Sequence, residues 1–253
     1  MCTVSWTGRP GGYDLFFNRD ELATRAPELP PAPAQRDGAT YAAPRDGDHG
    51  GTWLLANEFG LTICLLNDYA ATWRPADTAT RVSRGHMVLA CAAAADHAGV
   101  TELLQRQPLA RTPAFQLLAL APDEGALVMH WNGTRLEPRT RAAGLPLLSS
   151  SSFDTAAVIA RRTACFGATV RSPHRPAVEE LAAFHRQHER GESAYSVLMR
   201  RPDAATRSVI HVTVRPDQVG LRYEPVRWAM HRAVMLAPTR VSLPRSRPRG
   251  GSK

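Results

Sequence analysis

The second residue of this sequence is a cysteine, and this position could make its thiol unusually reactive. An initiator methionine is commonly removed before a small residue, and removal of Met1 would give Cys2 both a thiol and a free α-amino group. The reference pKa of an α-amine is about 7.7 to 8.0 and that of a thiol is about 8.5, so the amine can accept the proton that the sulfur loses. Cys2 is therefore a candidate nucleophile that carries its own base.

Polar residues that could assist Cys2 follow the apolar run from Tyr13 to Phe17. This run and the run from Thr3 to Trp6 are joined by a Gly-Arg-Pro-Gly-Gly segment, a pattern that predicts a β-hairpin. The second strand of a hairpin returns to the beginning of the first. The segment Asn18-Arg19-Asp20-Glu21 is therefore expected near Cys2.

Side chains alternate along a strand, so Arg19 is expected on the opposite face from Asn18 and Asp20. Arg19 could lower the pKa of the Cys2 thiol or bind a substrate carboxylate, and Asp20 could accept a hydrogen bond from the α-ammonium group. A solvent-exposed strand end is the alternative interpretation of these charges.

The remaining elements alternate between hairpins and helices. Residues 22–50 are rich in Pro, Ala, Asp and Gly without periodicity and predict a long surface loop. This order predicts an α+β protein with two antiparallel sheets packed face to face and helices outside both. Gly50-Gly51 is expected at a bend where backbone approaches backbone. Further hairpins are expected over 50–56 with 61–66 and 115–121 with 126–131, a short strand over 145–148, helices over 84–95, 100–107, 153–166 and 176–190, and closing strands over 193–199, 208–214, 220–223 and 230–236.

Length and composition indicate one globular unit. The chain has 253 residues, 43% hydrophobic and 21% charged, which predicts a single folded domain over 1–243 and a basic, disordered tail over 244–253. No stretch approaches the eighteen or so apolar residues of a membrane helix, and no signal peptide is apparent. We expect a cytoplasmic protein without a membrane span; the sequence gives no indication of its oligomeric state.

The net charge of +8 raises the question of nucleic acid, but the arginines are scattered and the dense basic cluster lies in the tail. No nucleic-acid partner is expected. Cys2, Cys64, Cys91 and Cys165 form no CxxC pair, and His185 with His188 is expected on a solvated basic helix face. No metal site is therefore predicted.

Five short motifs follow one another over the first third of the chain. Together they resemble the successive motifs of the NRDE family, also called the transport and Golgi organization 2 family. They are Met1-Cys2, the run Tyr13 to Phe17 leading into Asn18-Arg19-Asp20-Glu21, Gly50-Gly51-Thr52-Trp53-Leu54, Asn67-Asp68-Tyr69 and Ser83-Arg84-Gly85.

That family is similar to the N-terminal nucleophile hydrolases of the penicillin V acylase and choloylglycine hydrolase group. The resemblance implies a four-layer αββα sandwich in which a processed N-terminal cysteine attacks a non-peptide C–N amide bond. Cys2, Arg19 and Asp20 stand at the matching catalytic positions, and Asn67 is the counterpart of an oxyanion donor. A second asparagine of the group is replaced by Ser149 to Ser152. The residues expected to contact substrate are Asn18, Tyr69, Ser150 and Arg207.

The resemblance also implies a second function. Eukaryotic members are associated with haem trafficking and with lipid or acyl-CoA homeostasis, so the same cleft could bind haem or an acyl ligand without chemistry. The expected partner is thus a small-molecule amide, acyl or haem ligand. No cofactor is required for hydrolysis; haem, as a ligand, would need an axial residue such as His86 or His130.

Overall fold

The computed structural model describes residues 2–71, 80–139 and 144–246. The strands are β1 (Cys2–Arg9), β2 (Gly12–Leu22), β3 (Leu29–Arg36), β4 (Ala39–Arg45), β5 (Leu54–Asn57), β6 (Thr62–Asn67), β7 (Phe115–Ala121), β8 (Gly125–Trp131), β9 (Leu136–Pro138), β10 (Leu147–Ser150), β11 (Ala204–Val214), β12 (Gln218–Ala229), β13 (Arg232–Met235) and β14 (Thr239–Pro244). The helices are α1 (Gly85–Ala90), α2 (His97–Gln105), α3 (Thr155–Thr169) and α4 (Val178–Phe184).

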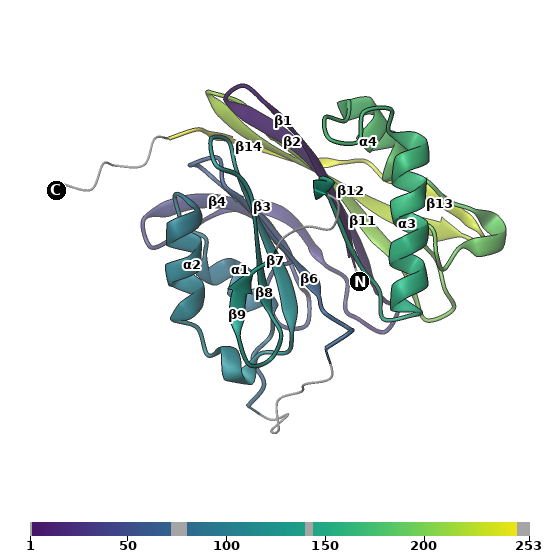
Figure 1. The fold of residues 1–253 in the computed structure, drawn as a ribbon, viewed down its shortest axis with the longest axis horizontal. Helices are drawn as coiled ribbons and strands as arrows, with labels where there is room; N and C mark the ends of the chain where they lie inside the picture. The colour runs from purple at the N-terminus through teal and green to yellow at the C-terminus, as the bar shows by residue number, and fades with distance from the viewer. Residues whose placement is uncertain (1, 72–79, 140–143, 247–253) are drawn as a thin grey trace.

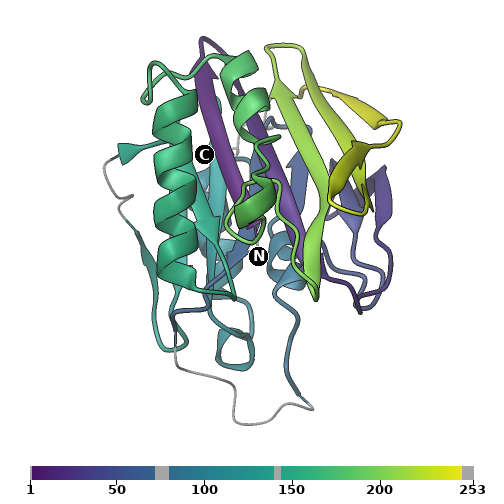
Figure 2. The same cartoon turned by 90° about the vertical axis from the view of Figure 1, so that its right-hand side faces the viewer.

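The strands form two antiparallel sheets. One has the order β10-β1-β2-β11-β12-β13, with β14 also paired to β12, and the other runs from β3 to β9 in chain order. Figure 1 shows the sheets stacked, with α3 and α4 beside the first and α1 and α2 beside the second. Figure 2 shows α3 and α4 in front of the purple strands β1 and β2. The predicted α+β class is confirmed.

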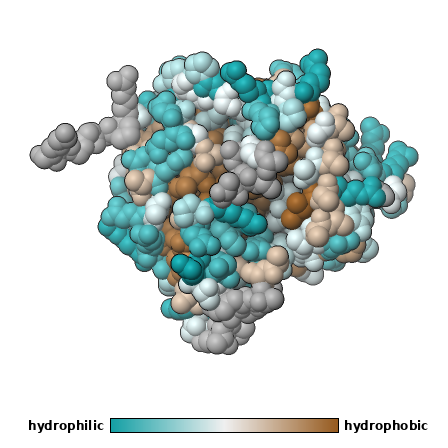
Figure 3. All heavy atoms as spheres, in the orientation of Figure 1, coloured by the Kyte–Doolittle hydropathy of each residue, from teal (hydrophilic) through white to brown (hydrophobic). Residues whose placement is uncertain are grey.

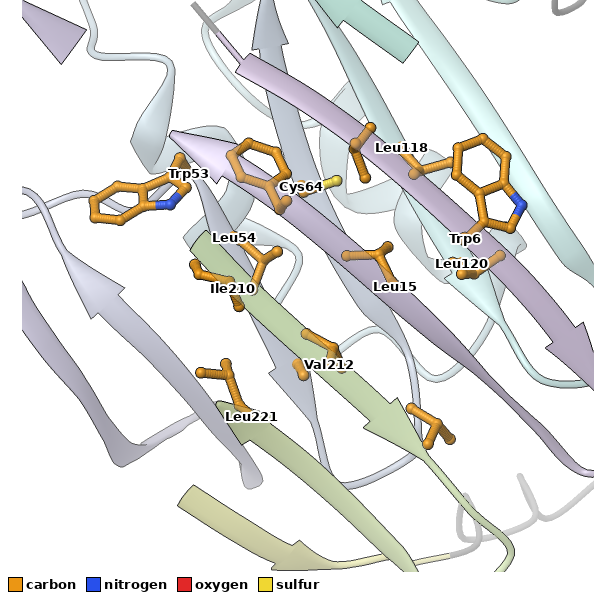
Figure 4. Packing of buried hydrophobic residues seen from close by; sticks show 14 of the residues in the cluster. Trp6, Leu15, Trp53, Leu54, Cys64, Leu118, Leu120, Ile210, Val212 and Leu221 are labelled. Atoms are coloured by element: carbon orange, nitrogen blue, oxygen red, sulfur yellow. The ribbon is translucent and has the colours of Figure 1, made fainter. Parts of the chain in front are cut away.

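Three hydrophobic clusters join these four layers. The largest lies between the sheets, where Leu15 and Ile210 of the first sheet meet Leu54 and Leu118 of the second (Figure 4). A second cluster packs α1 and α2 against the outer face of the β3–β9 sheet. A third packs Phe16 of β2 against α3 and α4. The predicted αββα layering is therefore present.

Strand β1 is buried on both faces, and its alternation explains how. Val4 and Trp6 enter the core between the sheets. Thr3 and Ser5 face the helices, where Thr3 Oγ1 accepts a hydrogen bond from Arg162 at 2.7 Å and Ser5 Oγ lies 2.8 Å from His185 Nε2. Buried hydroxyl groups need such partners, so β1 is tied to the helical layer by polar contacts.

The prediction of a long loop over residues 22–50 is wrong, because β3 and β4 form a hairpin there. Asp37 and Gly38 make its turn with φ of 49° and 80°, a conformation that suits an Asp-Gly pair. Strand β3 is at the edge of its sheet, where prolines are tolerated because one side of the strand needs no hydrogen-bond donors. The Asp37-Gly38 pair, which is typical of a hairpin turn, was therefore a better indicator of the structure of this segment than its proline content.

Several boundaries toward the C-terminus also differ. The strand expected over 193–199 is absent, and β11 begins earlier than predicted, at Ala204. The helix expected over 176–190 ends at Phe184. Strand β14 reaches Pro244, and Arg245 donates hydrogen bonds to Gly11 O and Arg215 O, so the expected tail does not begin at 244. Residues 247–253 lie outside the described part. No helix in the described ranges is long and apolar enough to cross a membrane.

Candidate active site

A pocket of about 900 Å³ opens where β1 begins and β2 and β6 end. Its wall includes the sequence-predicted residues Cys2, Arg19, Asp20, Asn67 and Tyr69. The face of the molecule in Figure 3 is mostly hydrophilic, and hydrophobic residues show mainly near its centre. The hairpin and the second sheet thus bring five residues from three separate segments to one cavity.

The register of β1 places Cys2 directly opposite Arg19 of β2 and Ser150 of β10. Cys2 belongs to the core between the sheets and is 7% exposed. Burial raises the pKa of the Cys2 thiol, and the nearby Arg19 charge opposes this by less. The Arg19 charge thus acts on the thiol pKa in the expected direction, but desolvation of the sulfur outweighs it and the pKa is raised.

The backbone N–H of Cys2 donates a hydrogen bond to Ser150 Oγ at 3.3 Å. Ser150 is buried and is not part of the pocket wall. The structure therefore assigns Ser150 to the support of the Cys2 backbone, and its predicted contact with substrate is not supported.

Arg19 lies on the opposite face of β2 from Asn18 and Asp20, as alternation predicted, and the pairing with Cys2 puts it on the inter-sheet face. Its guanidinium donates to Glu28 Oε2 at 3.0 Å and to Glu21 Oε2 and Asp46 Oδ2, both at 3.2 Å. Its Cζ atom lies 4.2 Å from the centre of the Trp53 ring. Three protein carboxylates already surround this cation, so the predicted binding of a substrate carboxylate by Arg19 is not supported.

Asp20 is held by a buried network on the helix-facing side of β2. Thr206 Oγ1 donates to Asp20 Oδ1 at 2.6 Å, and Arg162 Nη2 donates to Asp20 Oδ2 at 3.1 Å. Burial raises the pKa of Asp20, while the Arg162 charge opposes that shift. Sequence reasoning missed Arg162. The available signal was its place on the apolar stripe of α3 with Val158 and Phe166.

Asn18 lies away from the pocket, so its predicted role in substrate binding is not supported. Its Nδ2 donates to the carbonyl oxygens of His185 and Val197, both at 3.0 Å, and its Oδ1 lies 2.8 Å from His185 Nδ1. The same contacts correct the expected solvated position of His185, which is fully buried. Asn18 thus pins the end of α4 to the sheet.

Asn67 and Tyr69 adjoin each other in the pocket wall, as their spacing after β6 allows. Asn67 Nδ2 donates to the Tyr69 hydroxyl at 2.7 Å. An amide nitrogen has two hydrogens, and among the described residues the second has no acceptor. That N–H is available to a bound carbonyl oxygen.

Arg207 lies at a β-bulge of β11, between Thr206 opposite Asp20 and Ser208 opposite Arg19. A bulge redirects the side chain of the extra residue. Arg207 Nε lies 3.8 Å from Glu28 Oε2, and Arg207 is not part of the pocket wall. Its predicted contact with substrate is therefore not supported.

The predicted bend at Gly50-Gly51 is confirmed and shapes the pocket. A Cβ atom on Gly51 would lie 2.9 Å from the carbonyl carbon of Gly85, and Thr52 N donates to Gly85 O at 3.3 Å. The close approach brings Gly85 against Gly51 and Thr52, which precede β5. Within the described ranges no three His, Cys, Asp or Glu residues are grouped to hold a metal ion.

The chain belongs to the Transport and Golgi organisation 2 family, whose sequence profile matches residues 1–225. A comparison with curated proteins gave no match.

Solved structures of similar fold include a mutant of the conjugated bile acid hydrolase from Clostridium perfringens, with a TM-score of 0.52, 12% identity, and 93% of this chain and 92% of that chain covered. A second variant of that hydrolase has a TM-score of 0.52 and 11% identity, with 100% of both chains covered. The Caenorhabditis elegans ortholog of N-acylethanolamine-hydrolyzing acid amidase has a TM-score of 0.51 and 10% identity, with 83% of this chain and 92% of that chain covered. These similarities establish an N-terminal nucleophile hydrolase-like fold.

Proposed function

We propose that this family member hydrolyses a non-peptide amide, with Cys2 as nucleophile after removal of Met1. The observation that carries the proposal is that Cys2 and Asn67, from strands of different sheets, border one pocket of about 900 Å³. This volume suits a small-molecule ligand. The names of the structures with similar fold, a bile acid hydrolase and an acid amidase, support the same class of reaction.

In the proposed reaction the α-amine of Cys2 takes the proton of the thiol, and the sulfur attacks the amide carbon. The second N–H of Asn67 donates to the oxyanion that forms on the carbonyl oxygen. The ammonium then gives its proton to the nitrogen, which leaves as an amine and leaves an acyl thioester on Cys2. Water hydrolyses the thioester, which releases a carboxylic acid and restores the thiol.

The first experiment tests the base. Intact-mass measurement of the purified protein is expected to show loss of Met1, because only then does Cys2 have a free α-amine. Retention of Met1 on the whole population would contradict the mechanism.

The second experiment tests the nucleophile. Reaction with p-nitrophenyl acetate is expected to add one acetyl group to the wild type and to release p-nitrophenol in a burst. Cys2→Ala should lose both signals, whereas Cys165→Ala, which removes a partly buried thiol outside this pocket, should keep them. Equal labelling of both variants would exclude Cys2 as the acylated residue.

A second candidate function is binding without chemistry, and the raised pKa of the buried Cys2 thiol favours it. Haem fits this pocket only in part. His49 and His86 could supply an axial ligand, but five arginines in the wall replace much of the apolar surface that haem faces pack against. This candidate predicts a Soret band on addition of hemin that persists in Cys2→Ala and is lost in His86→Ala. Absence of saturable hemin binding would count against it.

A further inference from the structure

We infer that the ligand of the Cys2 pocket carries an anionic group, a carboxylate or a phosphate, which binds Arg84 with the support of Arg81 and Arg111. This inference deepens the proposed function and rests on it for the position of the scissile bond. It replaces Arg19, which the sequence suggested for a substrate carboxylate.

The charges of the pocket are distributed unevenly. On the β2 side, Arg19 and Arg25 are matched by carboxylates, since Arg19 contacts Glu21, Glu28 and Asp46 and Arg25 pairs with Asp46. Three other arginines line the opposite side of the pocket, namely Arg81, Arg84 and Arg111. No described carboxylate lies within 4.0 Å of their side-chain nitrogens.

Arg84 is the least exposed of these three arginines. It is half-buried, and the one described hydrogen bond of its side chain runs from Nη1 to the backbone carbonyl of Ala114 at 3.2 Å. Burial lowers the pKa of Arg84 and the neighbouring Arg81 charge adds to this effect, while the more distant Glu21 charge opposes it without an ion pair. A guanidinium remains charged in a protein, so a partly desolvated cation without a carboxylate partner favours an anion from outside.

The backbone fixes the position of Arg84. It immediately precedes α1, and the adjoining Gly85 packs directly on Gly51, where a side chain on either glycine would meet backbone atoms at about 3 Å. This contact holds Arg84 in the pocket wall that also contains Cys2 and Tyr69. A planar guanidinium can bind a carboxylate or phosphate through two parallel hydrogen bonds. The amide would thus face Cys2 while its anionic end binds the arginine wall.

The test measures binding without turnover. In the Cys2→Ala background, calorimetry would compare N-octanoylglycine, its uncharged amide N-octanoylglycinamide, and N-octanoylethanolamine phosphate. We expect one or both anionic probes to bind at least about 10-fold more tightly than the uncharged probe, with the difference shrinking at high salt. Comparison of the two anionic probes distinguishes a carboxylate from a phosphate ligand.

Arg84→Gln is expected to weaken the binding of the anionic probes by about 10-fold or more and to leave the binding of the uncharged probe unchanged. Arg84→Lys should restore part of the difference in affinity. The matched control is Arg227→Gln, an exposed arginine of β12 outside the pocket. Thermal unfolding would verify that the variants are folded. Equal binding of charged and uncharged probes, weakening of all probes alike by Arg84→Gln, or no binding of any probe would overturn the inference. Persistence of charge selectivity together with failure of Cys2-dependent hydrolysis would uphold the anion site and reject hydrolysis alone.

Discussion

The Asn18-Arg19-Asp20-Glu21 segment distributes its side chains between two layers. Arg19 faces the second sheet and gathers Glu21, Glu28 and Asp46, whereas Asn18 and Asp20 face the helices. Three of the four residues are therefore held by buried polar contacts. Their effect on Cys2 is mainly to fix the end of β2 beside it, since each contact restrains the strand that pairs with Cys2.

The ion pair of Asp20 and Arg162 gives a prediction for stability. Both side chains are almost fully buried, so removing one partner leaves an unpaired buried charge. We expect Arg162→Met to lower the free energy of unfolding by about 3 to 5 kcal/mol in urea denaturation. The double variant Asp20→Asn with Arg162→Met should recover a substantial part of that loss. A single variant as stable as the wild type would show that the pair contributes little.

At the level of elements, the hairpin of β1 and β2 carries Cys2, Arg19 and Asp20, and glycine makes its close packing against β11 possible. A Cβ atom on Gly12 would lie 2.1 Å from the carbonyl oxygen of Val214 on β11. Gly12→Ala is therefore expected to displace β2 from β11 and to lower the free energy of unfolding by about 1 to 3 kcal/mol. Gly8→Ala in the same hairpin is the control, because its Cβ meets nothing within 4 Å. Equal unfolding midpoints for the two variants would contradict this account.

Elements with strong local patterns were predictable from the sequence. The hairpin around Gly8 to Gly12, the strand pair flanking Asp123 and the helix near 155 appear close to their predicted bounds, whereas the helix predicted over 84–95 ends at Ala90 and the strand predicted over 50–56 begins at Leu54. Strand β3 was not predictable from composition, because its prolines are acceptable only at a sheet edge. Strand β14 was missed for a related reason, since its pairing with β12 is a tertiary contact.

In the site, too, features that depend on one strand were predictable, and features that depend on distant segments were not. Alternation correctly separated Arg19 from Asn18 and Asp20, because it is a property of one strand. The carboxylate partners of Arg19, the bulge at Arg207 and the pairing of Asp20 with Arg162 depend on segments far apart in the chain. No local pattern could supply them.

For the whole molecule, the buried His185 links stability to pH. Because Asn18 Nδ2 donates to two carbonyl groups, Asn18 Oδ1 is the acceptor from His185 Nδ1–H, and His185 Nε2 accepts from Ser5. The hydrogen bond from Ser5 requires the neutral ring, because a protonated Nε2 carries a hydrogen and cannot accept. Burial lowers the pKa of His185 to about 3, with further lowering by the Arg186 and Arg162 charges.

The sign of the pH dependence follows from these values. In the unfolded chain a histidine has a pKa of about 6.5, so between pH 6.5 and 3 the unfolded state binds a proton that the folded state does not. His185 therefore stabilises the fold fully above pH 6.5, and its contribution falls as the pH drops, by up to about 1.4 kcal/mol per pH unit. His185→Gln should be less stable at pH 7, where both hydrogen bonds of the ring are fully effective, and its deficit should shrink by about 2 kcal/mol at pH 5. Urea denaturation of both proteins across this interval measures the effect. A deficit that stays constant from pH 7 to pH 5 would show that His185 takes up protons equally in both states and is not the source of acid sensitivity.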